Sequence, residues 1–169
     1  MVRPILKLGM PALQRPSAAV VDFGGEIQRI VDDMIETMHA APGIGLAASQ
    51  IGVELRLFTL DLSVGRTASD LQVLVNPEIV ERDGMQLEEE GCLSLPGFSA
   101  TVLRPSRIVV RALDRDGSPK TVEGTGLLAR ALQHELDHLD GLLYVHRLRG
   151  LHRAVIQRRV RKLAHLGRW

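Results

Sequence analysis

Two histidines and a glutamate within five residues are the part of this chain best suited to chemistry. His134 and His138 are four residues apart, and Glu135 follows the first of them. On an α-helix, positions i and i+4 lie on the same face one turn apart, so both imidazoles can bind one metal ion. Glu135 then lies close enough to reach a water on that metal. The segment therefore predicts a metal site with an acid beside it.

The residues around this motif predict the helix that it needs. Apolar residues recur at helical spacing with Glu135 as the one polar member of the stripe, which predicts that this face is buried. Gly141 follows as a stop signal. A chance arrangement on an ordinary amphipathic helix is the alternative, because short motifs also occur by accident. The stripe consists of Leu127, Leu128, Ala131, Leu132, Glu135 and Leu139.

Length and composition predict a single globular domain over residues 1–169. Apolar residues make up 45% of the chain and charged residues 24%. No apolar run approaches the roughly 20 residues of a membrane span. Residues 1–16 lack the apolar core of a signal peptide. Cys92 is the only cysteine, which excludes an internal disulfide and fits a reducing compartment. We therefore expect a cytoplasmic protein without membrane contact.

The net charge of +1 conceals a strong asymmetry along the chain. Residues 1–146 carry 13 basic and all 20 acidic residues, a formal charge of −7, whereas residues 147–169 carry eight basic residues and no acid. The tail also has helical apolar spacing, which predicts a basic amphipathic helix at about 148–165. Such a helix can contact anionic partners such as nucleic acid, although a solvated basic face is at least as good an interpretation.

Hydrophobic periodicity predicts the remaining elements. A Pro-punctuated, extended start precedes a helix over about 24–41, and segments rich in Val, Ile and Leu predict strands. The strands lack a βαβ rhythm, so we expect an α+β fold with mainly antiparallel sheet. Asn76-Pro77 predicts an edge or a bend in the second strand. The predicted strands are 55–62, 71–80 and 107–113, the last forming a hairpin with 119–123.

Two further stretches have compositions that favour a site. Gly43–Gln50 is small and glycine-spaced, and it lacks the Gly-Lys-Ser/Thr ending of a phosphate loop. Either it is a tight turn, or its close backbone approach accommodates a peptide while Gln50 offers an amide N–H to a substrate oxygen. Glu88–Gly97 places Cys92 between a glycine and a loop. Three interpretations of Cys92 follow: a small buried apolar residue, a catalytic nucleophile, or the third metal ligand.

The residue that serves as the third metal ligand distinguishes the possible classes of metal enzyme. A catalytic site usually has three protein ligands and one open position. The metzincin pattern requires a histidine where this chain has Tyr144, and no acid follows Asp140 to complete a thermolysin-type set. His146 could also serve as the third ligand, but its spacing from His138 matches neither of these patterns. Cys92 is therefore the strongest candidate, and a small protease using His134, His138 and His146 is the competing interpretation.

With these residues in view, the chain resembles the peptide deformylases of the bacterial type. Three segments match that family's three motifs in order and at similar spacing, and the resemblance extends from about Pro4 to the basic C-terminal helix. Family members often carry an acid near the position of His146, so this chain departs from the pattern there. The matching segments are Gly43–Gln50, Glu90–Ser94 and Gln133–His138.

The resemblance implies a divalent ion held by Cys92, His134 and His138, with water as the fourth ligand. Ferrous iron is the expected ion, and zinc, nickel and cobalt are alternatives. The implied reaction is hydrolysis of the N-formyl group from the formyl-methionine of new polypeptides, which releases formate. Glu135 would move the protons, while the side chain of Gln50 and the backbone N–H of Leu93 would stabilise the oxyanion.

The resemblance also implies how substrate is bound. An apolar pocket would hold the methionine side chain, although Arg130 is unusual in an apolar wall. Backbone near Gly45 and Gly91 would pair with the extended substrate. Asp137 or Glu90 would fix the histidines, and Glu90 would otherwise pair with Arg104. The family implies a monomer, and the basic helix suggests ribosome contact. A binding protein with a decayed site is a weaker alternative, because every catalytic position is present. The pocket residues implied are Ile44, Gly45, Gly91, Leu127, Arg130, Ala131 and His134.

Overall fold

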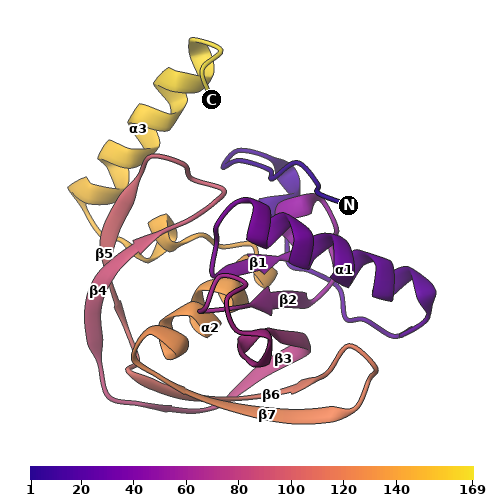
Figure 1. The fold of residues 1–169 in the computed structure, drawn as a ribbon. Coiled ribbons are helices and arrows are strands. Elements are labelled where there is room, and N and C mark those ends of the chain that lie inside the picture. Colours follow the sequence, from indigo (N-terminus) through magenta and orange to yellow (C-terminus); the bar gives the residue numbers. More distant parts are fainter.

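The computed structural model describes all residues 1–169 and has two antiparallel sheets and three α-helices (Figure 1). The larger sheet has the strand order β1-β2-β3-β6-β7, and the smaller one is the β4–β5 hairpin. The predicted α+β architecture with mainly antiparallel sheet is confirmed. The helices are α1 (Gly25–Ala40), α2 (Gly126–Leu139) and α3 (Leu151–His165). The strands are β1 (Gly45–Ala47), β2 (Leu57–Leu60), β3 (Gln72–Asp83), β4 (Gln86–Gly91), β5 (Ser99–Arg104), β6 (Arg107–Leu113) and β7 (Pro119–Thr125).

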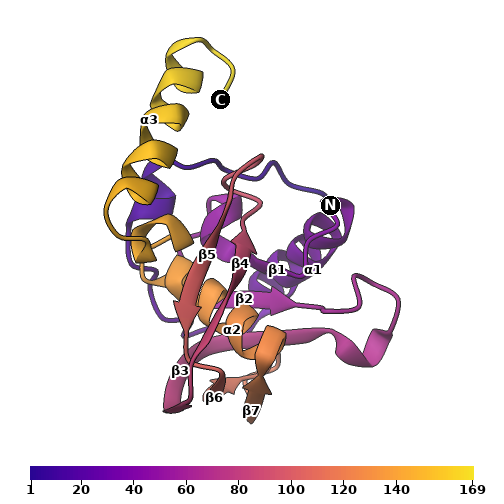
Figure 2. The ribbon, with the colours of Figure 1, turned by 90° about the vertical axis from the view of Figure 1, so that its left-hand side faces the viewer.

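Helix α2 carries the His-Glu-x-x-His motif and lies at the centre of the molecule (Figure 1). Its apolar face packs on the five-stranded sheet, with Leu132 and Leu136 in one buried cluster with Phe58 and Ile108. The β4–β5 hairpin crosses the helix from the other side (Figure 2). Because α2 is covered on two sides, its polar residues are buried as well. The predicted stripe is wrong at Leu127, which is 47% exposed at the start of the helix.

The end of α2 is fixed by Gly141. Its φ of +75° is a left-handed conformation that favours glycine. A Cβ there would also lie 2.8–2.9 Å from backbone atoms of Gln14 and Arg15. The same segment is tied to the helix end, because the N–H of Ser17 donates to Leu139 O at 2.8 Å. The extended N-terminus is thus held against the end of α2.

Helix α1 packs on β1 and β2 through Ile27, Val31, Met34 and Met38, so these two strands lie between α1 and α2. The helix begins and ends within one residue of its predicted bounds. The predicted bend at Asn76 is confirmed as a register shift in the β3–β6 pairing. Asn76 has a φ of +50°, and its side-chain amide exchanges two hydrogen bonds with the backbone of Val20.

The sequence analysis predicts no strand between residues 80 and 107, and the structure has two there. Strand β4 contains three consecutive glutamates, which have low strand propensity. The strand forms because β5 pairs with it over six residues and because the hairpin covers α2. Tertiary packing therefore overrides local propensity in this segment. No helix in the structure is both long and apolar enough to pass through a lipid bilayer.

Asp61, at the end of β2, organises the loop that follows it. Its carboxylate accepts hydrogen bonds from the backbone and hydroxyl of Ser63, the backbone of Gly65 and the ring of His39. Burial raises the pKa of Asp61, but the bonds from Ser63, Gly65 and His39 outweigh this and lower it to about 2. The ionised carboxylate therefore holds the loop to the end of α1.

Replacing Asp61 by Asn is expected to lower the free energy of unfolding at pH 7 by about 2 kcal/mol, the scale of a lost charged hydrogen bond. Because the folded-state pKa is lowered, the contribution of the carboxylate is complete above pH ~4 and is lost as the pH falls toward ~2. Urea unfolding of both proteins at several pH values measures this contribution to the free energy of unfolding. Asp116→Asn, at an exposed turn, is the control and should change little. A wild-type advantage that persists unchanged at pH 2 would contradict the assignment.

Candidate metal centre and active site

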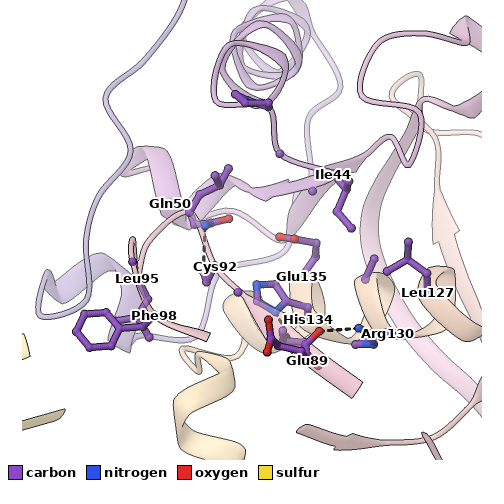
Figure 3. A pocket seen from close by; sticks show the side chains of 18 residues that line it. Ile44, Gln50, Glu89, Cys92, Leu95, Phe98, Leu127, Arg130, His134 and Glu135 are labelled. Carbon is purple, nitrogen blue, oxygen red and sulfur yellow. Dashed lines mark hydrogen bonds and ion pairs between the residues drawn. The ribbon is translucent and has the colours of Figure 1, made fainter. Parts of the chain in front are cut away.

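Three segments meet at one cavity beside α2 (Figure 3). They are β1 with the 3-10 turn Ala48–Ile51, the end of β4 with the loop after it, and α2 itself. These segments contain the three motifs singled out in the sequence. Strand β1 replaces the tight turn proposed for residues 43–50, and it pairs with β2 along its three residues.

Cys92, His134 and His138 form a compact group of ligand atoms. One ligand atom from each lies within 4.8 Å of the other two. Cys92 Sγ is 3.2 Å from His138 Nε2. His146 is not part of this group. Its Nδ1 accepts the backbone N–H of Leu143 at 2.9 Å, and His146 does not line the cavity.

His134 is oriented by a buried carboxylate. Its Nδ1 lies 2.8 Å from Glu90 Oε1, so Nε2 is left to face the cavity. A histidine that donates its other ring nitrogen to a carboxylate is the usual arrangement of a metal ligand. The ring also stacks on Tyr144 with an interplanar angle of 24°. Of the two residues expected to fix the histidines, Glu90 does so and Asp137 does not.

Arg104, the last residue of β5, binds two buried carboxylates, those of Glu90 and Asp137. Its guanidinium donates to both oxygens of Glu90 at 2.5 and 2.9 Å and to Asp137 at 3.0 Å. Arg147 donates to Asp137 from the other side. Arg104, Glu90 and Asp137 are all nearly inaccessible to solvent. The predicted pair of Glu90 and Arg104 is therefore present, within a larger network.

This network determines the protonation of the metal-free site. Burial alone raises the pKa of Glu90, but bonds from His134 and Arg104 lower it, so Glu90 stays ionised. Burial lowers the pKa of His134, but Cys92 and Glu90 together raise it well above its ordinary value. Burial and the charge of His134 lower the pKa of His138 well below the ordinary value. Because a metal-binding imidazole nitrogen must be deprotonated, His134 would have to lose its proton if it held an ion.

Glu135 is buried beside these ligands without a partner for one of its oxygens. Its Oε2 has no hydrogen bond, and the residue is 4% exposed. Burial, and to a smaller extent the charge of Glu90, raises the pKa of Glu135 to about 7 against the opposing effect of His134. The carboxylate lies against Gly45, where a Cβ would collide with it. A glycine at position 45 is therefore required by this close approach.

Gln50 presents its amide N–H group to the cavity. The backbone N–H of Ala47 donates to Gln50 Oε1 at 2.8 Å, which fixes the orientation of the amide. Gln50 Nε2 donates to Ser94 Oγ at 3.1 Å and lies 3.7 Å from Cys92 Sγ (Figure 3). The backbone N–H of Leu93 makes no hydrogen bond within the protein. The amide of Gln50 is therefore held beside Cys92 by its bonds to Ser94 and to the thiol, whereas the N–H of Leu93 is free to bind a ligand.

The cavity has a volume of about 450 Å³, and all the pocket residues implied by the resemblance line it. Arg130 lies along its wall, and its Nη1 donates to the backbone oxygen of Glu89 at 2.8 Å, linking α2 to β4. Most of the other lining residues belong to the two stretches singled out in the sequence, Gly43–Gln50 and Glu88–Gly97. Pro42 and Phe98 lie just outside these stretches and had no signal in the sequence.

The residues present fit a divalent ion. A thiolate and two imidazoles suit iron or zinc, and three ligands leave a coordination position open. The unpartnered Oε2 of Glu135, the free N–H of Leu93 and the amide N–H that Gln50 directs at Cys92 then surround the position where a further molecule would bind. Sequence reasoning missed Ser94 and Tyr144, whose contacts with Gln50 and His134 depend on tertiary structure.

Replacing Arg104 by Leu is expected to lower the free energy of unfolding by about 3–5 kcal/mol, because two buried carboxylates lose their cation. Metal affinity should fall about 10–100-fold as His134 loses its fixed partner. Denaturant unfolding and metal competition with a chromophoric chelator measure the two effects.

The matched control for Arg104 is Arg107, which also bridges two carboxylates but at the surface. Arg107→Leu should leave metal affinity unchanged and have a much smaller effect on unfolding. Arg104→Lys keeps the charge and should fall between wild type and Arg104→Leu. Equal effects of the Arg104 and Arg107 substitutions would contradict the role of the buried network.

Comparison with known proteins agrees with this geometry. Residues 2–154 match the family model described as polypeptide deformylase. A peptide deformylase of Acidobacterium capsulatum is 48% identical over 169 residues, covering 100% of this chain and 99% of the relative. Peptide deformylase 2 of Streptomyces avermitilis is 49% identical over 162 residues, covering 95% and 87%.

Solved structures show the same similarity. The crystal structure of a peptide deformylase from Legionella pneumophila superposes with a TM-score of 0.92 at 43% identity, covering 99% of this chain and 98% of that one. The enzyme from Thermus thermophilus gives 0.87 at 43% identity, covering 95% and 94%. The chain therefore belongs to the polypeptide deformylase family, metal-dependent hydrolases that remove the N-formyl group from newly synthesised polypeptides.

Proposed function

We propose that this chain performs its family's reaction with Cys92, His134 and His138 holding the divalent ion and Glu135 acting as general base. The observation that carries the proposal is the position of Glu135. It is a buried carboxylate with one unpartnered oxygen, beside three metal-type ligands, at the inner end of a cavity. When bound, the ion lowers the pKa of a water ligand toward ~7 and polarises the formyl carbonyl.

Glu135 has the proton affinity that the reaction needs. Hydrolysis requires a group that takes a proton from water and later gives it to the leaving amine. A carboxylate whose pKa is raised toward 7 by burial can do both near neutral pH. The charge of a bound ion would favour the ionised form, so Glu135 would be a base in the loaded enzyme.

Gln50 and Leu93 are proposed as the oxyanion donors. The amide of Gln50 is held by Ala47 and Ser94 with its N–H group toward Cys92, so it needs no reorientation during the reaction. The backbone N–H of Leu93 is free beside it. Losing one such donor typically costs about 10²–10³ in rate.

The proposed substrate position follows from the cavity walls. The methionine side chain would lie among Ile44, Leu127, Ala131 and the aliphatic part of Arg130. The extended chain after it would pair with backbone near Gly45 and Gly91, at the ends of β1 and β4. Main-chain pairing tolerates any sequence, which suits an enzyme acting on most new proteins.

Ferrous iron is the proposed native ion, because thiolate and imidazole suit it, although zinc, nickel and cobalt match the same donors. A ferrous thiolate site would also be sensitive to oxygen through oxidation of Cys92. We further propose that residues 1–169 form one domain that works as a monomer in the cytoplasm. Ribosome contact through the basic faces of α3 is part of this proposal.

Formate release from formyl-Met-Ala-Ser, with protein loaded anaerobically with Fe(II), tests the reaction. Rapid turnover is expected for the wild type, and none for the metal-free protein. Glu135→Ala should reduce kcat by at least about 10²-fold at unchanged metal content, because the general base is lost. No turnover at full metal occupancy would reject the proposal.

Cys92→Ser serves as the control for the ligand set. It should abolish tight metal binding, measured by metal analysis after dialysis. A small protease using His134, His138 and His146 would instead keep its metal in this variant. Retained metal and retained activity would therefore reject Cys92 as a ligand.

Ribosome contact is tested by reversing two exposed charges on α3, Arg158→Glu with Arg161→Glu. Deleting residues 148–169 would also remove Ile156 and Val160 from the core, so charge reversal is the cleaner change. Co-sedimentation with ribosomes should fall several-fold and become less dependent on salt. The control is Arg29→Glu with Arg82→Glu, which lie at exposed positions on the body. Equal binding by both pairs would reject the helix as the contact.

A further inference from the structure

A large groove outside the metal site lies between the β4–β5 hairpin and α3. Its volume is about 1280 Å³. Small-molecule pockets are typically ~300–1000 Å³, so the groove has the size of a site for a polypeptide segment. Helix α3 lies beside the hairpin in Figure 1, and none of the proposed metal ligands lines the groove. We call it the hairpin–α3 groove.

Both walls of the hairpin–α3 groove expose large apolar side chains. Leu87 and Leu103 are direct cross-strand partners on the hairpin and are 63% and 59% exposed. Leu151 and Val155 lie one turn apart on α3 and are 81% and 54% exposed. Single exposed apolar residues are ordinary, but four that line one groove from two facing elements indicate an interaction surface.

The helix does not need these apolar residues to pack on the body. Ile156 and Val160 perform that role and are buried in a cluster with Leu95 and Tyr144. Leu151 and Val155 lie on the neighbouring stripe, toward the hairpin. Their exposure is therefore additional to the contacts that hold α3 in place.

The charges around the groove are mostly positive. Arg149 and Arg153 line it and form no ion pair within the protein. Arg147 is neutralised by Asp137, and Glu89 is the only acid among the lining residues. A partner with acidic side chains next to an apolar stripe would match both the exposed apolar residues of the groove and its unpaired arginines.

We propose that the hairpin–α3 groove binds an amphipathic helical segment of another protein, with leucine-type side chains on its inner face and acidic residues on its flanks. The apolar stripe would fill the space between Leu103 and Leu151, as in helix-in-groove recognition. The flanking acids would pair with Arg149 and Arg153. The groove shares only Glu89 with the substrate cavity and none of the proposed metal ligands, so deformylation should continue while the groove is occupied.

Fluorescence anisotropy with a labelled peptide of about 14 residues tests the proposal, using leucines at i, i+3, i+4 and i+7 and glutamates on the flanks. A dissociation constant in the micromolar range is expected. A peptide with lysine in place of every glutamate should bind at least 10-fold more weakly. Raising the salt concentration should weaken only the glutamate peptide.

Leu151→Asp and Leu103→Asp, one from each wall, should each weaken binding by at least 10-fold. Leu166→Asp is the matched control, since Leu166 is 53% exposed near the end of α3 and does not line the groove. Thermal unfolding and formate release of all three variants should match the wild type, which separates loss of binding from loss of fold.

Three outcomes would overturn the proposal. One is equal binding of both peptides, or equal binding by Leu151→Asp and wild type. Another is a concentration-dependent dimer of the wild type that Leu151→Asp dissociates, which would assign the groove to a second copy of the chain. The third is displacement of the peptide by a short RNA from the wild type but not from Arg149→Glu with Arg153→Glu, which would assign the arginines to nucleic acid.

Discussion

The buried guanidinium of Arg104 is the interaction on which the rest of the site depends. It lies between Glu90 of β4 and Asp137 of α2, and through Glu90 it sets the orientation of His134. Two carboxylates so close together and out of water would otherwise take up protons. With the arginine in place Glu90 stays charged and accepts a hydrogen bond from His134. One cation thus joins a strand, a helix and a metal ligand.

This constraint explains why the hairpin and the metal helix fold as a unit. Glu90 and Cys92 come from β4 and the loop after it, and Arg104 comes from the end of β5. The bonds from Arg104 to Asp137 and from His134 to Glu90 therefore fix the hairpin over α2 and place Cys92 beside the two histidines. Replacing buried ion pairs by apolar residues is often neutral or stabilising. The pair is therefore better explained by the geometry of the site than by stability.

The sequence predicted the elements in which local pattern and tertiary structure agree. Helices α1 and α2 have apolar residues at helical spacing and glycine after their ends, so both were expected, and α1 lies within one residue of its predicted bounds. The structure brings Cys92, His134 and His138 together, as expected for the proposed ligands. The β4–β5 hairpin did not, because glutamates at 88–90 disfavour a strand locally and are tolerated only through pairing with β5. Ser94 and Tyr144 were also missed, since their contacts with Gln50 and His134 join segments distant in sequence.

The same geometry links metal binding to folding. His138 Nδ1 and Glu135 Oε2 are buried without hydrogen-bond partners in the protein. Each unpartnered buried group costs about 1–3 kcal/mol. A metal ion that binds only the folded chain stabilises it according to its concentration and affinity.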